Sequence, residues 1–470
     1  MPIGDIVPEV AVLLAAVAAL LLACFVPQRR HAWCGLLALL GLLVAGGLCA
    51  LQLSQPPRLS FSGSWAIDAA SIWARLLIIA AAAVALLCAP EWLHSDRRHG
   101  EYYAVLLLST LGAMMMAGAA DTLQLVMGML LASITGYVMA AYHRDWAVSV
   151  EAGMKYFLLG AFANSLLMVG IALLYGLLGS SNYAAMAAAL AASPASPLLL
   201  LALALVIVGI GFKLGAVPAH AWLPDVAQGA PAPAAAFLTV VPKIGAAIAL
   251  ARLLLLFDDA SGWRTLVAAM AVATMTLGNL AALWQTDLRR LLGWSSVSQA
   301  GYALMAVAVV GLIAQALPAL LLFLAGYAAA NLAAFAVVTQ LRGRTALHDY
   351  RGLATQRPWV TAVLTLALLS LTGIPPLAGF AGKLMLFVTT LDAGFVVLAV
   401  ALLVNTVISL FYYLRVLAPM FFEPAPGNTA VELLGRSAGM AVFVAAVATV
   451  GVGLGAGAVL AAFGAPRLLP

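Results

Sequence analysis

The sequence predicts an all-α polytopic membrane protein with about 14 transmembrane helices. Hydrophobic residues make up 65% of the 470 positions and charged residues only 8%, and the mean hydropathy is +1.10. A soluble domain carries roughly 25% charged residues. The apolar runs reach ~20 residues, about twice the length of a membrane β-strand. Because only helices and closed barrels satisfy their backbone in lipid, runs of this length indicate helices.

Fourteen apolar runs between charged or Pro/Gly-rich breaks are the expected spans. The chain start carries Asp5 and Glu9 and no basic residue, so the first run is expected to be a retained helix and not a cleaved signal. The longest connections, 180–196 and 342–358, are too short for a separate soluble domain. The spans lie near 7–27, 33–53, 68–90, 102–120, 122–142, 150–178, 197–217, 231–256, 265–285, 288–311, 316–341, 359–390, 394–420 and 437–463.

Arginines are distributed unequally between the two sides of this predicted bundle. Connections after odd-numbered spans hold thirteen arginines, whereas the other side and both ends hold four: Arg58, Arg252, Arg264 and Arg467. Positively charged connections stay in the cytoplasm. The bias therefore predicts that both termini lie outside, and it supports the span count because one miscounted span would remove it.

All four lysines lie inside expected spans: Lys155, Lys213, Lys243 and Lys383. A charge at the bilayer centre costs at least ~2.5–3.5 kcal/mol. Arginine stays protonated, whereas a buried lysine can lose its proton. Arginine-favouring codons would explain why lysine is rare but not why it is placed here. We therefore expect these lysines to be functional.

Two of the expected spans are interrupted. In the seventh, Lys213 is followed by VPAHAWLPDV, where Pro218 removes a backbone donor. In the twelfth, the stretch SLTGIPPLAGFAGK ends on Lys383. Interrupted helices at corresponding positions of two halves are typical of inverted-repeat transporters. The pattern S-x-x-G-Y also occurs twice, within 132–137 and within 297–302.

These features predict two inverted five-helix repeats with broken helices 7 and 12. The expected bounds are 1–100 for an N-terminal three-helix segment, 101–257 and 264–423 for the two repeats, and 436–470 for a C-terminal helix. An odd number of spans per repeat makes the two repeats opposite in topology.

The lysines are expected to form a polar row. Glu151 and Lys155 are four residues apart on one helix face, and form either a structural ion pair or a pair that tunes a neighbouring lysine. Lys243 has no local partner, so its amine is expected to face water or a polar group of another helix. Lys213, Lys243 and Lys383 would then lie near mid-membrane, bridged by Ser, Thr, Tyr and water.

The roles of the other polar residues are less well indicated by the sequence. His220, beside the first break, is the one histidine expected to act. Asp225 either pins the break or titrates, and Asp68 and Arg75, seven apart, are expected to pair. The remaining histidines are expected on solvated cytoplasmic connections: His31, His94, His99, His143 and His348.

Several chemistries are not expected of this chain. The four cysteines show no metal-ligand spacing and are interpreted as small buried residues. The sequence has no cysteine cluster for iron–sulfur and no dinucleotide fingerprint, so we expect no cofactor and no metal in this chain. No basic cluster with aromatic neighbours indicates nucleic acid.

The stretch VPAHAWLPDVAQGAPAPAAAFLTVVPKIGA resembles the antiporter-like membrane subunits of proton-pumping NADH:quinone oxidoreductase, respiratory complex I. Further similar stretches are SVEAGMKY, LRRLLGWSSVSQAGY, HDYRGL and LTGIPPLAGFAGK, in order from about 100 to 420. The run QGAPAP favours the N subunit, the counterpart of mitochondrial subunit 2, over its larger paralogues and over Mrp-type antiporters.

The resemblance implies a proton path through the bacterial inner membrane. On matching positions it would use Lys213, then Lys243 as central relay, then Lys383, with Glu151, Lys155 and His220 as further polar positions. FMN, iron–sulfur clusters and quinone would belong to partner subunits. The partners would be other membrane subunits of the complex and the lipid bilayer.

This sequence departs from the family pattern at two positions. The fifth-helix glutamate that pairs with the lysine of the first broken helix is Leu130 here, and a tenth-helix histidine is Gln299. Either another group, such as Glu151, replaces the glutamate, or the subunit is mainly structural with an impaired channel. A subunit of an Mrp-type cation/proton antiporter or membrane-bound hydrogenase is the other alternative.

Overall fold

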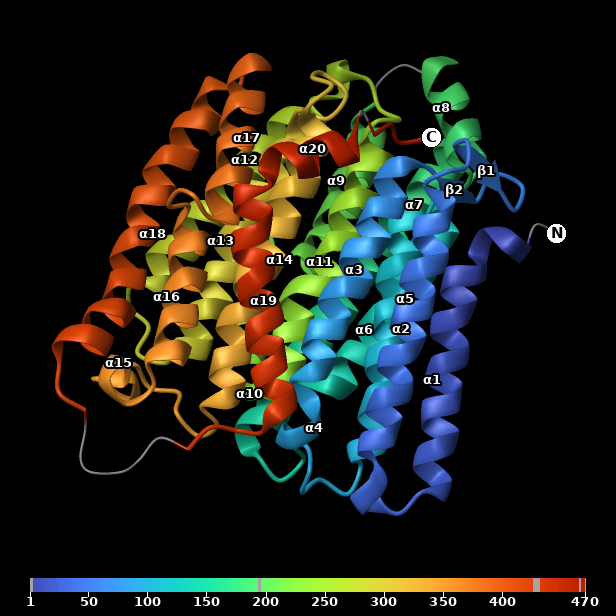
Figure 1. The fold of residues 1–470 in the computed structure, drawn as a ribbon. Helices are drawn as coiled ribbons and strands as arrows, with labels where there is room; N and C mark the ends of the chain where they lie inside the picture. Colours follow the sequence, from blue (N-terminus) through green and yellow to red (C-terminus); the bar gives the residue numbers. More distant parts are fainter. Residues whose placement is uncertain (1–2, 193–195, 426–431, 465, 470) are drawn as a thin grey trace.

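The computed structural model describes residues 3–192, 196–425, 432–464 and 466–469. The chain forms one bundle of roughly parallel and antiparallel helices (Figure 1). The bundle consists of α1 (Val7–Phe25), α2 (Ala32–Gln52), α3 (Ala69–Leu87), α5 (His99–Gly118), α6 (Thr122–Ala140), α7 (Ala147–Leu178), α9 (Pro197–Leu214), α11 (Ala232–Leu254), α12 (Trp263–Ala282), α13 (Leu288–Ala308), α14 (Ala316–Gln340), α16 (Pro358–Thr372), α17 (Ala378–Asp392), α18 (Val396–Phe422) and α19 (Arg436–Leu454).

Short elements occupy the connections. The helices are α4 (Ala89–Trp92), α8 (Tyr183–Ala192), α10 (Trp222–Gly229), α15 (Leu353–Gln356) and α20 (Ala456–Phe463). The 3-10 turns are η1 (Ile3–Ile6), η2 (Gln28–Arg30), η3 (Asp259–Ser261) and η4 (Leu347–Tyr350). Strands β1 (Arg58–Ser60) and β2 (Trp65–Ile67) form an antiparallel hairpin that the sequence did not predict.

The all-helical membrane fold is confirmed. Within the described residues, 12 helices are long and apolar enough to cross a membrane. The other two predicted spans are α13, which begins with Arg289 and Arg290, and the interrupted pair α16 and α17. Both described ends of the chain lie on one side of the bundle, opposite the α1–α2 connection, α4 and α15 (Figure 1).

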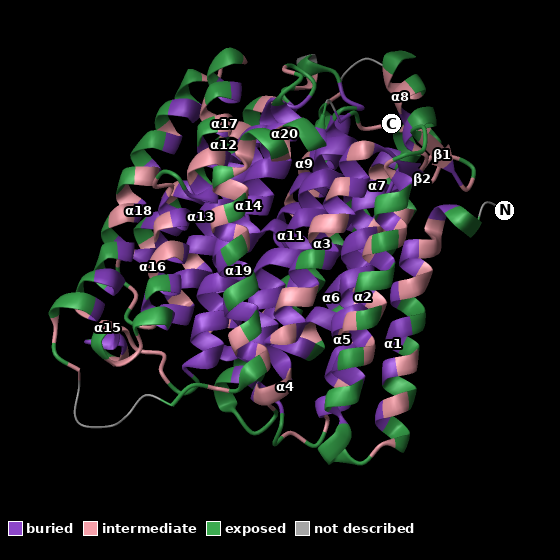
Figure 2. Cartoon of the chain, viewed as in Figure 1, coloured by how far each residue is buried: buried purple, intermediate pink, exposed green. Residues whose placement is uncertain are grey.

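The core lies around α11 and α14, in which every residue is buried. Figure 2 shows these helices in the buried colour at the centre, whereas α1, α2, α18 and α19 carry many exposed positions. Small residues permit close packing: a Cβ on Gly245 of α11 would lie 2.4 Å from the Ala113 carbonyl oxygen of α5. The helix that carries Lys243 is therefore enclosed by protein.

Both interrupted helices break at a glycine with the same hydrogen-bond pattern. After α9, Gly215 has φ +73°, and the Ala216 amide donates to the Gly211 carbonyl at 2.9 Å. After α16, Gly373 has φ +96°, and the Ile374 amide donates to the Leu369 carbonyl at 3.0 Å. Glycine adopts this left-handed conformation without a Cβ penalty, which is the usual helix stop. The predicted breaks are therefore present, and each has the same local cause.

The predicted Asp68–Arg75 pair is wrong. Arg75 Nη1 donates instead to Glu9 Oε1 at 3.0 Å, and Arg252 Nη1 donates to Asp68 Oδ2 at 2.6 Å. Asp68 caps α3 by accepting from the Ser71 amide, so its side chain points away from Arg75. Arg252, counted with the connections although it lies near the end of the expected span 231–256, is fully buried in the last turn of α11.

The expectation that five histidines are solvated is also partly wrong. His31 and His99 are buried, and the Gly100 amide donates to His31 Nδ1 at 3.1 Å. His143 has a side chain that is only 10% exposed. His94 and His348 are exposed, as expected.

Candidate functional site

Lys213 lies in the last turn of α9, just before the first break, and is 1% exposed. Its Nζ donates to the Tyr156 hydroxyl of α7 at 3.1 Å. The amine also lies 5.2 Å from the Tyr156 ring centroid and 6.0 Å from that of Tyr137, within cation–π range. Trp222 of α10 stacks on Tyr156 at 4.2 Å and holds the ring in place. The acceptor of Lys213 is thus a neutral hydroxyl.

Lys243 lies in the middle of α11 and is 1% exposed. Its Nζ donates to the Ser296 carbonyl of α13 at 2.5 Å and to the Ser296 hydroxyl at 2.8 Å. The Ser296 hydroxyl lies 2.6 Å from the Tyr327 hydroxyl of α14, which donates to the Thr239 carbonyl at 2.8 Å. The expectation that this amine faces a polar group of another helix is confirmed.

Lys383 lies in α17, after the second break, and is 4% exposed. Its Nζ donates at 2.9 Å to the carbonyl of Thr372, the last residue of α16. The last carbonyls of a helix have no partner inside the helix, so the break creates the acceptor that this lysine uses. The Tyr302 ring of α13 lies 4.4 Å from the amine.

One face of α13 connects the second and third lysines. Ser296, Gln299 and Tyr302 follow each other at intervals of three residues, which places them on one helix face. Ser296 holds Lys243, Gln299 Nε2 donates to the Leu371 carbonyl at 3.1 Å beside the Lys383 acceptor, and Tyr302 lies under Lys383. Among the described residues no hydrogen bond joins Lys213 to Lys243.

A separate charged cluster surrounds Asp225. Lys155 Nζ contacts Glu151 at 2.7 Å and Asp225 at 3.2 Å, and Arg290 Nη1 contacts Asp225 at 2.5 Å. The i, i+4 pair is confirmed, and Asp225 ties α10 to α7 and α13. Lys155 is 44% exposed and Glu151 62%. This cluster is therefore at the surface, unlike the three buried lysines.

The structure does not bring Glu151 to Lys213. The Glu151 carboxylate contacts Lys155, whereas the Lys213 amine contacts Tyr156. Of the lysines, all within the described ranges, only Lys155 has a carboxylate within 4.0 Å. The partner of Lys213 is thus a tyrosine hydroxyl, from the residue next to Lys155 in the sequence.

His220 lies in the loop between α9 and α10 and is half-buried. Its Nδ1 is buried without a hydrogen-bond partner, and its ring lies 5.8 Å from that of Trp294. The structure places it at the break but not in contact with Lys213.

Sequence reasoning expected serine, threonine and tyrosine beside the lysines but could not name Tyr156, Ser296, Tyr327 or Thr372. Tyr156, Ser296 and Tyr327 are neutral polar residues in apolar helices, which is their only local signal. Thr372 provides a main-chain carbonyl, which no residue type indicates. Which lysine each one faces depends on how the helices pack.

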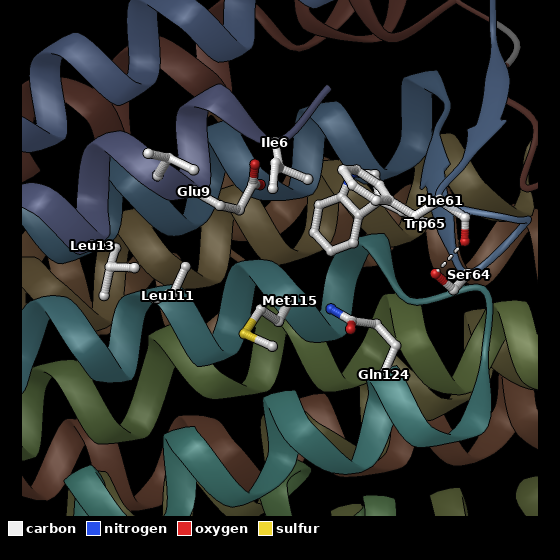
Figure 3. Close-up of a pocket in the computed structure, with 10 residues that line it drawn as sticks. Ile6, Glu9, Leu13, Phe61, Ser64, Trp65, Leu111, Met115 and Gln124 are labelled. Carbon is white, nitrogen blue, oxygen red and sulfur yellow. Dashed lines mark hydrogen bonds between the residues drawn. The ribbon is translucent and has the colours of Figure 1, made fainter. Parts of the chain in front are cut away.

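The other candidate sites in the described structure offer weaker evidence of a function than the three buried lysines. The cysteines are all free, and three of them are buried. In the described ranges no three His, Cys, Asp or Glu residues lie together as metal ligands. A cavity of about 330 Å³ lies beside Glu9, Trp65 and Gln124 (Figure 3), at the outer edge between α1, α5 and the hairpin and away from the buried lysines.

The fold and its enclosed lysines define an antiporter-like membrane subunit. The family described as "NADH:quinone oxidoreductase/Mrp antiporter, TM" matches residues 119–409. The NADH-quinone oxidoreductase subunit N of Mycobacterium sp. (strain JLS) is 44% identical over 87% of this chain and 87% of its own. A chain of respiratory complex I from Thermus thermophilus has a TM-score of 0.84 at 32% identity and covers 98% of this chain and 100% of its own.

The chain belongs to the subunit N family of NADH-quinone oxidoreductases. A chain of the Mrp complex from Dietzia sp. DQ12-45-1b has a TM-score of 0.84 at 22% identity, covering 99% of this chain and 97% of its own. At that identity the likeness concerns the fold alone.

Proposed function

We propose that this chain conducts protons across the membrane as a non-redox subunit of a proton-translocating NADH:quinone oxidoreductase. The observation that carries the proposal is the set of three buried lysines, Lys213, Lys243 and Lys383, each bonded to neutral oxygen atoms. A lysine without a fixed carboxylate partner can gain and lose its proton with changes in hydration or in a neighbouring charge. Such groups suit a relay better than permanent ion pairs do.

The path would run from Lys213 through Lys243 to Lys383. The α13 face with Ser296, Gln299 and Tyr302 supports the second step, because hydroxyl and amide groups can hold water between the two amines. Water would have to complete the first step. Lys155, Glu151 and His220 would act at the entrance, since Asp225 and its cluster lie on α10 directly after the break.

Two five-helix repeats, 101–257 and 264–423, would supply the two halves of this path. The matching glycine breaks at Gly215 and Gly373 support that division, as does the presence of one lysine beside each break. The arginine-rich connections would face the cytoplasm of a bacterial cell and both termini the outside.

Redox chemistry would take place in partner subunits that hold FMN, iron–sulfur clusters and the quinone site. Within the complex this chain would sit beside other membrane subunits. Conformational or electrostatic changes at quinone reduction would then alter the protonation of the lysine row.

One observation supports a second candidate, a mainly structural subunit. Leu130 stands where the family has its glutamate, and the Lys213 partner is Tyr156. The other alternative, an Mrp-type antiporter or a membrane-bound hydrogenase subunit, is disfavoured by the membership in the subunit N family. Purification from native membranes checks this, because flavin and iron–sulfur subunits that accept NADH are expected to co-purify only with a complex I subunit.

The test of proton conduction is Lys243→Met in the assembled complex, reconstituted in vesicles. We expect fewer protons translocated per NADH oxidised. Gln52→Met is the control, because Gln52 is equally buried and polar but bonds to the Asp5 carbonyl, away from the lysines. A normal proton yield from a fully assembled Lys243→Met complex would contradict the proposal and favour the structural role.

A further inference from the structure

Two adjoining pockets open at the end of the bundle that carries the arginine-rich connections. The first has a volume of about 330 Å³ and lies between the α4–α5 and α6–α7 connections. The second, of about 310 Å³, lies between α5 and α6. They share Arg98, Tyr142 and Arg144 as lining residues, so they lie side by side, and the two pockets together are called the hollow.

The first pocket is strongly basic. It is lined by Arg97, Arg98, Arg144 and Arg342, against two acidic residues, Asp96 and Asp145. Within the described ranges none of these four guanidinium groups forms an ion pair. Arg342 stacks over the Trp92 ring at 4.9 Å, which holds one guanidinium group at the pocket wall. With four guanidinium groups against two carboxylates, the pocket has an excess of positive charge.

The floor of this pocket is fixed by hydrogen bonds. Trp92 Nε1 donates to His143 Nε2 at 3.1 Å, and His143 Nδ1 lies 3.5 Å from Asp96 Oδ2. Burial lowers the pKa of His143 more than the nearby Asp96 raises it, and Arg342 lowers it further. The lowered pKa disfavours a charge on the imidazole, so the positive charge of the pocket comes from its arginines.

The second pocket is apolar along one wall. Val105, Val138 and Ala141 line it below Arg98, Arg144 and the carboxylate of Glu101, whose Oε2 is buried without a hydrogen-bond partner and so offers Arg98 and Arg144 a negative neighbour. It opens on the outward face of α6, where Val138 is 47% and Ile134 is 60% exposed. In the assembled complex an exposed apolar helix face is covered either by lipid chains or by a neighbouring subunit, and the arginines at its end favour an anionic lipid. A basic pocket that continues into an apolar groove matches an amphipathic anion.

We propose that this hollow, the arginine pocket with the α5–α6 groove, binds the phosphate headgroup of an anionic phospholipid with an acyl chain along α6. Arginine pairs with phosphate oxygens through two parallel N–H groups, and basic pockets at the cytoplasmic ends of transmembrane helices bind anionic headgroups. Trp146, 41% exposed beside the pocket, lies where tryptophans anchor membrane proteins at the interface. The site is independent of the lysine row.

The test uses the purified, assembled complex in detergent. Native mass spectrometry would count bound phosphatidylglycerol and phosphatidylcholine with identical acyl chains. We expect the wild-type complex to retain phosphatidylglycerol in preference to phosphatidylcholine. Arg98→Gln with Arg144→Gln should weaken phosphatidylglycerol binding about 25-fold, since each arginine near an anionic lipid contributes roughly a factor of five.

A matched control changes two exposed arginines on the same side of the bundle outside the hollow, Arg30→Gln with Arg436→Gln; like Arg98 and Arg144, these described residues form no ion pair. It should retain the lipid as the wild type does. Equal retention of the two lipids by the wild-type complex, or equal loss in the control, would overturn the proposal. If the Arg98/Arg144 variant does not assemble, the proposal is judged by whether the wild-type complex retains phosphatidylglycerol in preference to phosphatidylcholine.

Two further outcomes identify other occupants. Displacement of the lipid by excess inorganic phosphate would show a site for free anions and overturn the lipid assignment. Loss of a neighbouring subunit from the Arg98/Arg144 variant, with lipid content unchanged, would show that an acidic protein segment fills the hollow and would also overturn it.

Discussion

The three buried lysines differ in what holds them. Lys213 depends on one side chain, the Tyr156 hydroxyl, whereas Lys243 and Lys383 each reach a backbone carbonyl. A hydrogen bond to a charged group contributes about 1.5–3 kcal/mol. The contact of Lys213 can therefore be removed by a single substitution that deletes one oxygen atom.

Tyr156→Phe is expected to lower the proton yield and the melting temperature of the complex. The ring, its stacking on Trp222 and its cation–π contact remain in the variant. Any decrease in proton yield or melting temperature therefore measures the contribution of the hydroxyl group alone. Tyr183→Phe is the control, because the Tyr183 hydroxyl is buried without a hydrogen-bond partner. Removing this hydroxyl should leave the proton yield and the melting temperature unchanged. Equal effects of the two variants would argue against a role of Tyr156 in positioning Lys213.

A second residue-scale prediction concerns Asp68. Burial alone would raise its pKa, but the charge and hydrogen bond of Arg252 outweigh burial, so the pKa lies below the ordinary 3.8. The folded pKa is thus depressed relative to the unfolded one. The stability contributed by the pair is present above the ordinary value and is lost as pH falls below it.

Asp68→Asn removes this charge at neutral pH while an amide oxygen can still cap α3. We expect a loss of about 3–5 kcal/mol, because Arg252 is left buried and unpaired. Thermal unfolding of the purified complex measures it. Asp5→Asn should cost much less, since its partner Arg58 is 34% exposed. A similar melting temperature for both variants would refute the argument from burial.

At the scale of the element, the helix breaks depend on glycine. A Cβ on Gly373 would lie 3.0 Å from Lys383 Cδ, and its φ of +96° disfavours any other residue. Gly373→Ala should therefore cost about 1–2 kcal/mol and also displace the lysine side chain.

Gly394, at the far end of α17, separates these two effects. Its φ is +80°, but no atom lies within 4 Å of a Cβ added there. Gly394→Ala should reduce the melting temperature by a similar amount while leaving the proton yield unchanged. Gly373→Ala should reduce both. If both variants pump normally, the geometry of the second break does not control Lys383.

At the scale of the whole molecule, the side on which each connection lies can be measured. In a variant with Cys24→Ala, Ser54→Cys before the hairpin should react with a membrane-impermeant maleimide in intact spheroplasts. Arg97→Cys should react only after the membrane is opened. The reverse pattern would invert the predicted orientation while leaving the span count intact.

The sequence predicted most of the fold, because each span is a continuous apolar run and each break carries its own glycine and prolines. It could not predict the hairpin 58–67, whose strands of three residues have no periodicity to detect. It also misassigned the partners of Asp68 and Arg75, because seven-residue spacing shows only that two side chains share a helix face. Their true partners, Arg252 and Glu9, come from helices that are far apart in the chain.

The lysine positions were visible in the sequence, whereas their acceptors were not, because two of the four acceptor atoms, the Ser296 and Thr372 carbonyls, are main-chain atoms that any residue type would provide. This has a consequence for how the family can diverge. The Thr372 carbonyl that receives Lys383 exists because α16 ends there, and no change of side chain at 372 deletes it. A substitution at 372 therefore leaves the acceptor of Lys383 in place, and one at 296 removes the hydroxyl but leaves a carbonyl acceptor for Lys243. A substitution of Tyr156 removes the one hydrogen-bond acceptor of Lys213 among the described residues.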